Sequence, residues 1–81
     1  MSNQDRLRQC FREAFSLAPD AAIDAMNYQK DPIWDSLGHM RLVATIETTF
    51  NIMFTTDQIL DMNSFVKAHE IVRQHGISLE A

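Results

Sequence analysis

Residues 34–52 read WDSLGHMRLVATIETTFNI, and this stretch decides the fold that we expect. From Ser36 to about Phe50 it contains no proline, and its one glycine, Gly38, falls in the first turn of the helix that the pattern predicts. Placed on a helix at about 100° per residue, the apolar side chains separate into two stripes. The stripe that we expect to face the core comprises Leu42, Val43, Ile46, Phe50 and Met53. One such stripe is enough for a surface helix to fold.

The second apolar stripe lies on the far side of the same helix. It comprises Leu37, Met40 and Ala44, with Glu47 and Asn51 beside them and Ser36 next to it. Two interpretations are open. These side chains either pack beneath the long loop that precedes the helix, or they form an exposed docking strip edged with acid.

The start of this helix carries a serine whose hydroxyl the helix does not need. Asp35 can serve as the N-cap, which leaves Ser36 at the first helical position with its hydroxyl free to point outward. A phosphate attached there would meet unpaired backbone N–H groups and the positive end of the helix dipole. The position suits a phosphoserine-type linkage and offers little that would activate the serine as a nucleophile.

Helices are also expected on both sides of this segment. The first begins at Ser2 and has an apolar face of Leu7, Cys10, Phe11, Ala14 and Phe15. A short helix should start at about Thr56, because Thr55 and Gln58 have the spacing of a capping box. Asn63 or Ser64 caps a last helix with an apolar face of Phe65, Ala68, Ile71 and Val72, and Gly76 ends it.

The stretch from Ser16 to Asp35 is long for a loop. We expect it to lie packed over the core through Ile23, Met26, Tyr28, Ile33 and Trp34, with a short helical turn after Asp20. The predicted fold is all-α: a small four-helix bundle with three longer helices, one short helix and a long first loop. Residues 1–81 are expected to form a single domain.

Composition and charge restrict the class of protein. The chain has 81 residues, is 46% apolar and carries a net charge of −4, which is typical of one small globular domain. Residues 20–61 hold seven acidic and two basic side chains, a sum of −5. This acidic middle argues against nucleic acid and anionic membranes and favours basic partner surfaces, although a solvated surface without any partner fits as well. With no membrane span, no signal peptide and the single cysteine Cys10, we expect a cytoplasmic monomer.

No set of residues with catalytic or metal-binding spacing is apparent. A hydrolase serine would need a G-x-S-x-G turn after a strand, and neither is present. His39 falls at the edge of the core stripe, and His69 and His75 fall on different faces of the last helix. Asp57 and Asp61 lie one turn apart and extend the acidic surface. We therefore predict neither an enzyme nor a metal site.

These residues together resemble the acyl carrier protein family. The resemblance begins with the motif Asp35-Ser36-Leu37 at the start of a helix. It continues through WDSLGHMRLVATIETTFNI, the short helix TDQILDM and a capped last helix that ends in RQHG. It covers essentially the whole chain, helix lengths and long first loop included.

The resemblance implies a cofactor and a set of partners. In that family a phosphopantetheinyl transferase attaches 4′-phosphopantetheine from coenzyme A to the motif serine, here Ser36, which is flanked by Asp35 and Leu37. The thiol of this arm carries acyl groups as thioesters between acyl-loading and acyl-transferring or synthase enzymes. The implied docking residues for these partners are Leu37, Met40, Arg41, Ala44, Glu47 and Asp57. The core is expected to part between helices to shelter an apolar cargo.

Departures from the family's usual pattern bear on the pathway. Carriers of housekeeping fatty-acid synthesis usually resemble one another in a strongly acidic second helix. Here Gly38, His39, Arg41 and Thr48 stand where acids would be common, and Glu47 is the only acid between Ser36 and Asn51. We therefore expect a carrier of a specialised pathway, such as polyketide, modified-lipid, surface-glycan or aminoacyl-transfer synthesis. We expect it to be free-standing, with an excised domain of a larger synthase as the alternative. An aminoacyl or peptidyl carrier and an unmodified helical adaptor that binds through Leu37 and Met40 are the alternatives.

Overall fold

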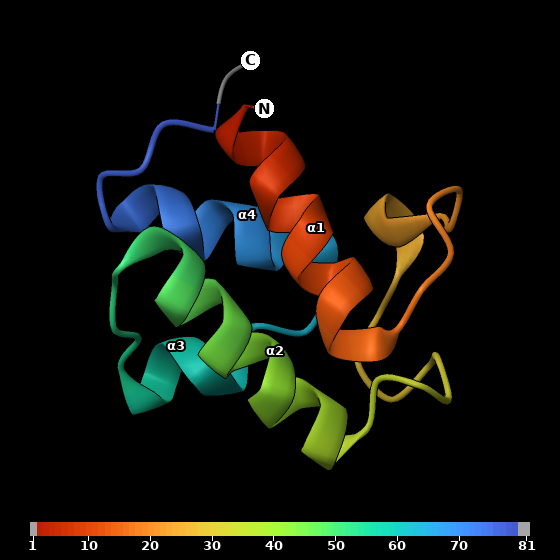
Figure 1. The fold of residues 1–81 in the computed structure, drawn as a ribbon. Helices are drawn as coiled ribbons and strands as arrows, with labels where there is room; N and C mark the ends of the chain where they lie inside the picture. The colour runs from red at the N-terminus through yellow and green to blue at the C-terminus, as the bar shows by residue number, and fades with distance from the viewer. Residues whose placement is uncertain (1, 80–81) are drawn as a thin grey trace.

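The computed structural model describes residues 2–79, and within this range it is helical with no strand. The elements are α1 (Asn3–Phe15), the 3-10 helix η1 (Ile23–Ala25), α2 (Ser36–Phe50), α3 (Thr56–Asp61) and α4 (Phe65–Gln74) (Figure 1). Three of these helices are long and α3 is short, and a long segment separates α1 from α2. The predicted all-α class, the short helical turn after Asp20 and the helix order are confirmed.

Side-chain caps define where each α-helix begins. In every case the oxygen of a cap side chain accepts a hydrogen bond from the backbone N–H three residues further on, which satisfies one of the unpaired groups of the first turn. The N-caps are Ser2, Asp35, Thr55 and Ser64. At α3, Gln58 completes the capping box by accepting from the N–H of Thr55 at 3.0 Å. All four starts agree with the sequence, and Ser64 rather than Asn63 caps α4.

The predicted end of α2 at about Phe50 is confirmed, but one residue assigned to its core stripe lies beyond that end. Asn51 takes the left-handed conformation, with φ 54° and ψ 50°, and its N–H bonds to the carbonyl of Glu47. The helix therefore stops before Met53, whose side chain is 80% exposed. The prediction that Met53 belongs to the core stripe is wrong, because helical spacing does not extend past Asn51. Phe54 is buried in this segment instead.

The core is built around a cluster of aromatic rings. Phe11 of α1 makes edge-to-face contacts with Trp34 of the long loop at 5.4 Å and with Phe65 of α4 at 5.3 Å between ring centroids. Trp34, Leu42 and Ile46 are fully buried. One cluster thus joins α1, the loop, α2 and α4, which matches the apolar faces predicted for these helices.

The segment from Ser16 to Asp35 covers this core, as expected. Ile23, Met26 and Trp34 are buried and Tyr28 is half-buried. Ile33 was expected to pack with them, but its side chain is 45% exposed. Its neighbour Trp34 points into the core, and Ile33 faces out.

Gly38 allows α1 and α2 to approach closely. A Cβ at this position would lie 2.8 Å from Cε1 of Phe15 and 3.0 Å from the carbonyl oxygen of Ile33. Both distances are shorter than ordinary van der Waals contact. The glycine in the first turn of α2 is therefore explained by packing.

The two ends of the described chain meet. Nδ2 of Asn3 donates to the carbonyl of Ser78 at 2.9 Å, and α1 and the segment after α4 come together at one end of the molecule (Figure 1). Within residues 2–79, none of the helices is long and apolar enough to cross a membrane.

Candidate functional site

Ser36 is the first residue of α2, and its side chain is exposed. The cap is made by Asp35, whose Oδ1 accepts from the N–H of Gly38 at 2.8 Å. Among the hydrogen bonds of residues 2–79, the Ser36 hydroxyl has one, to the hydroxyl of Tyr28 at 3.0 Å. The predicted division of roles at this helix start, with Asp35 as the cap and Ser36 exposed, is confirmed.

Two backbone donors lie beside this hydroxyl. The N–H groups of Ser36 and Leu37 belong to the first turn, where an α-helix has no carbonyl to offer. Neither of them donates a hydrogen bond to another described residue. Together with the helix dipole they favour a negatively charged group at this position.

His39 supports the site without taking part in acid–base chemistry. Its Nδ1 accepts from the indole N–H of Trp34 at 3.0 Å, and its Nε2 lies 2.8 Å from the carbonyl oxygen of Ile59. An indole nitrogen only donates and a carbonyl only accepts, so these partners require the neutral ring with the proton on Nε2. Both nitrogens are occupied, and the ring is buried. His39 is thus a structural residue at the core edge, as predicted, and it joins the first turn of α2 to α3.

The second apolar stripe of α2 is on the surface. Leu37 is 71% exposed and Met40 is 54% exposed, and Ala44 is exposed as well. The interpretation that these side chains pack beneath the long loop is wrong. On α3, Leu60 is also exposed, next to the Ile59 carbonyl that His39 contacts. An exposed apolar surface, formed by Leu37 and Met40, therefore lies next to Ser36.

Two of the charged residues expected at the docking surface bond within the molecule. Nη1 of Arg41 donates to the carbonyl of Ala14 at the end of α1, at 3.0 Å. The carboxylate of Glu47 accepts from the N–H of Phe54 at 2.9 Å and is half-buried. Asp57, in the first turn of α3, is exposed. Arg41 and Glu47 are therefore held within the molecule, and Asp57 is the exposed acidic residue of this set.

Tyr28 is the site residue that sequence reasoning missed. The pattern placed it only among the apolar residues of the loop, and no periodicity connects residue 28 with residue 36. The turn from 27 to 34 brings them together: it is closed by Gln29 N–H donating to the Trp34 carbonyl at 3.0 Å and by Trp34 N–H donating to the Asp31 carbonyl at 2.9 Å.

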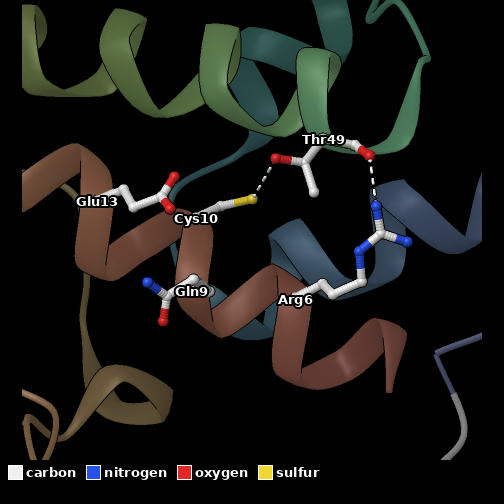
Figure 2. A pocket seen from close by; sticks show the side chains of 5 residues that line it. All are labelled: Arg6, Gln9, Cys10, Glu13 and Thr49. Atoms are coloured by element: carbon white, nitrogen blue, oxygen red, sulfur yellow. Dashed lines mark hydrogen bonds between the residues drawn. The ribbon is translucent and has the colours of Figure 1, made fainter. Parts of the chain in front are cut away.

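A hollow of about 200 Å³ between α1 and α2 is the other candidate site (Figure 2). It is lined by Arg6, Gln9, Cys10, Glu13 and Thr49. The Cys10 thiol donates to Oγ1 of Thr49 at 3.3 Å, and Arg6 donates to the carbonyl of the same threonine at 2.8 Å (Figure 2).

This hollow does not carry nucleophilic chemistry. Burial raises the pKa of the Cys10 thiol, which keeps it protonated at neutral pH. Thr49 lies near the end of α2, roughly 20 Å along the helix from Ser36 by the rise per residue. The hollow is therefore separate from the serine site. Across residues 2–79, no three His, Cys, Asp or Glu side chains are grouped as metal ligands would be.

No protein family, curated protein or solved structure matches this chain. The case for a function therefore rests on the residues at the start of α2.

Proposed function

We propose that this protein is an acyl carrier that bears a 4′-phosphopantetheine arm on Ser36. The observation that carries the proposal is the exposed Ser36 hydroxyl at the first position of α2. This hydroxyl does not cap the helix, because Asp35 does. A serine that capped the helix would have its oxygen engaged by a backbone N–H, whereas this oxygen is available to an enzyme from outside. The Asp35-Ser36-Leu37 motif that resembles the acyl carrier family lies at the same place.

The residues around Ser36 fit a phosphodiester. The free N–H groups of Ser36 and Leu37 and the positive end of the α2 dipole favour a single negative charge at the helix start. The arm, when attached, supplies a terminal thiol that holds acyl groups as thioesters. The chain itself contributes the attachment oxygen and the surface on which partner enzymes dock.

The attachment step is a substitution at phosphorus. The Ser36 oxygen forms a bond to the phosphorus of the pantetheine phosphate of coenzyme A, and the bond from that phosphorus to adenosine bisphosphate breaks. The serine proton passes to a base of the transferase, because His39, the nearest imidazole on α2, has both nitrogens engaged. The chain thus relies on its partner for acid–base catalysis.

The pathway is proposed to be a specialised one. Among the residues implied as docking contacts, Arg41 and Glu47 are held by bonds within the molecule, and the exposed contacts next to Ser36 are apolar. A partner that contacts mainly Leu37 and Met40 needs an apolar binding surface more than a strongly basic one. The cargo is an acyl group, a polyketide intermediate or an aminoacyl group.

A second candidate function is an adaptor that binds a partner through Leu37 and Met40 without any covalent group. The high exposure of these two side chains favours it as well. The two functions differ in whether Ser36 is modified.

Intact-mass spectrometry separates them. The protein is incubated with coenzyme A and a broad-specificity phosphopantetheinyl transferase, with a known carrier as the positive control. One arm's mass should be added to the wild type and to Ser78→Ala, which removes another exposed serine, and none to Ser36→Ala. Absence of the added mass in the wild type, while the control carrier is fully modified, would leave the adaptor function.

A further inference from the structure

The hydrogen bond between Tyr28 and Ser36 is not needed to fold the helix, since Asp35 already caps it. Resting on the proposed function, we propose that Tyr28 is a positioning residue for the modified serine. Its hydroxyl orients the Ser36 oxygen before the arm is attached and donates to the phosphate of the arm afterwards.

Two aromatic neighbours contact the Tyr28 ring, and a hydrogen bond fixes the backbone of the same residue. Its backbone N–H donates to the carbonyl of Asn63 between α3 and α4, at 2.9 Å. The ring meets His39 edge-to-face at 4.9 Å and Trp34 at 6.3 Å between centroids. His39 and Trp34 are in turn joined by their own hydrogen bond. The phenol oxygen is therefore presented at the helix start by a rigid aromatic group, at little cost in side-chain entropy.

Before attachment, the useful direction of the bond is from Tyr28 to Ser36. Either oxygen can donate at the observed 3.0 Å. When the phenol donates, it occupies one lone pair of the serine oxygen and leaves the serine O–H free to face the base of the transferase. The second lone pair of the serine oxygen then remains available to phosphorus.

After attachment, the same phenol has a better acceptor. The Ser36 oxygen becomes an ester oxygen, which accepts hydrogen bonds weakly, and a phosphodiester with one negative charge is bonded to it. A phenol O–H that donates to an anionic oxygen makes a charge-assisted bond, shorter and stronger than a bond between neutral groups. Asp35 cannot serve this purpose because a carboxylate only accepts. Tyr28 is the neutral side-chain donor seen at this oxygen.

The first test uses Tyr28→Phe, which keeps the ring and removes only the hydroxyl. Initial rates of arm attachment should fall about fivefold in kcat/KM, the loss that corresponds to one neutral hydrogen bond. Both proteins are then modified to completion and compared by phosphorus NMR. The phosphodiester resonance of the variant should lie closer to that of the denatured carrier than the wild-type resonance does. Identical resonances in the folded proteins would overturn the proposal, even if the rate fell.

The second test needs no variant. Tyr28 is the only tyrosine in the chain, so protein labelled with carbon-13 at the phenol carbon gives a single signal for it. This signal should move when the arm is attached to the wild type. A signal that stays in place would mean that Tyr28 only fastens the loop to the helix. If the wild type cannot be modified at all while a control carrier is, the proposed function fails first, and that result is read from the mass alone.

Discussion

Gly38 lies where α1 and α2 meet at a distance that a methyl group would obstruct. In an exposed helix, replacement of glycine by alanine is worth about 1 kcal/mol of stability. Here the new Cβ would press on the buried Phe15 ring and the Ile33 carbonyl, and overpacking of this kind costs about 1–3 kcal/mol. Gly38→Ala should therefore lower the free energy of unfolding, measured by urea denaturation. Ala44→Gly, at an exposed position of the same helix, measures the difference in helix propensity between alanine and glycine without the packing effect. A more stable Gly38→Ala protein would show that α1 and α2 can move apart without loss of stability.

Asp35 and Ser36 are adjacent, but they should differ in what they contribute to stability. Asp35→Ala removes the cap and should cost about 1 kcal/mol. Ser36→Ala removes only an exposed hydroxyl bonded to Tyr28, and should change the free energy of unfolding by less than about 0.5 kcal/mol. Thermal or urea unfolding followed by circular dichroism measures both. Equal and large losses would mean that the serine is structural.

At the scale of the helix, α2 presents apolar side chains that folding does not use. Met40→Glu should slow arm attachment roughly fivefold or more, because a charge would be desolvated at the contact with the transferase. Met53→Glu is the matched control: the same change at a more exposed methionine, beyond the other end of α2. Rates are compared at low and moderate salt, with circular dichroism for the fold. Loss in both variants, or in neither, would contradict a docking surface at Leu37 and Met40.

Where local patterns suffice, the helices could be predicted from the sequence. Caps depend on residues three apart, so Asp35 and Thr55 with Gln58 could be predicted, and Ser64 was one of two candidates for its helix. The exposure of Ser36 followed from the cap at Asp35. Met53 was wrongly assigned to the core because the helical spacing of apolar residues continues past Asn51. The backbone takes the left-handed conformation at Asn51, and the helix ends there. The contacts of Tyr28 with Ser36 and of His39 with Ile59 depend on the course of irregular segments, which no period encodes. These two contacts are the part of the site that could not be predicted from the sequence.

At the scale of the whole molecule, an ion pair ties the long loop to α1. Nε of Arg8 lies 3.0 Å from Asp24 of η1, and this hydrogen bond is the main cause that lowers the pKa of the Asp24 carboxyl. A carboxyl whose pKa is lowered by folding stabilises the folded state above its unfolded pKa, and that stabilisation is lost as the pH falls through the lowered value. The Asp24 side chain is 62% exposed and solvent screens the pair, so its contribution is small, about 0.2–1 kcal/mol.

Asp24→Asn tests this pair. At neutral pH and low salt, the free energy of unfolding of the variant should be lower than that of the wild type by about 0.2–1 kcal/mol. The difference should begin to shrink below about pH 4, where the Asp24 carboxyl of the unfolded chain becomes protonated, and should disappear once the pH falls below the lowered pKa of the folded carboxyl. High salt should also reduce it. Urea unfolding over a pH series measures it. A difference that persists unchanged at low pH would assign the effect to packing of η1 rather than to charge.

The central claim is that Ser36 carries an arm that ends in a thiol, and a thiol titration of the native protein tests it most directly. Cys10 is the only cysteine, and it is 1% exposed and kept protonated by burial, so the unmodified native chain should react slowly with Ellman's reagent. After treatment with transferase and coenzyme A, and removal of the excess coenzyme, one rapidly reacting thiol per chain should appear in the wild type and none in Ser36→Ala. An unchanged titration in the wild type, with a control carrier gaining its thiol, would contradict the account.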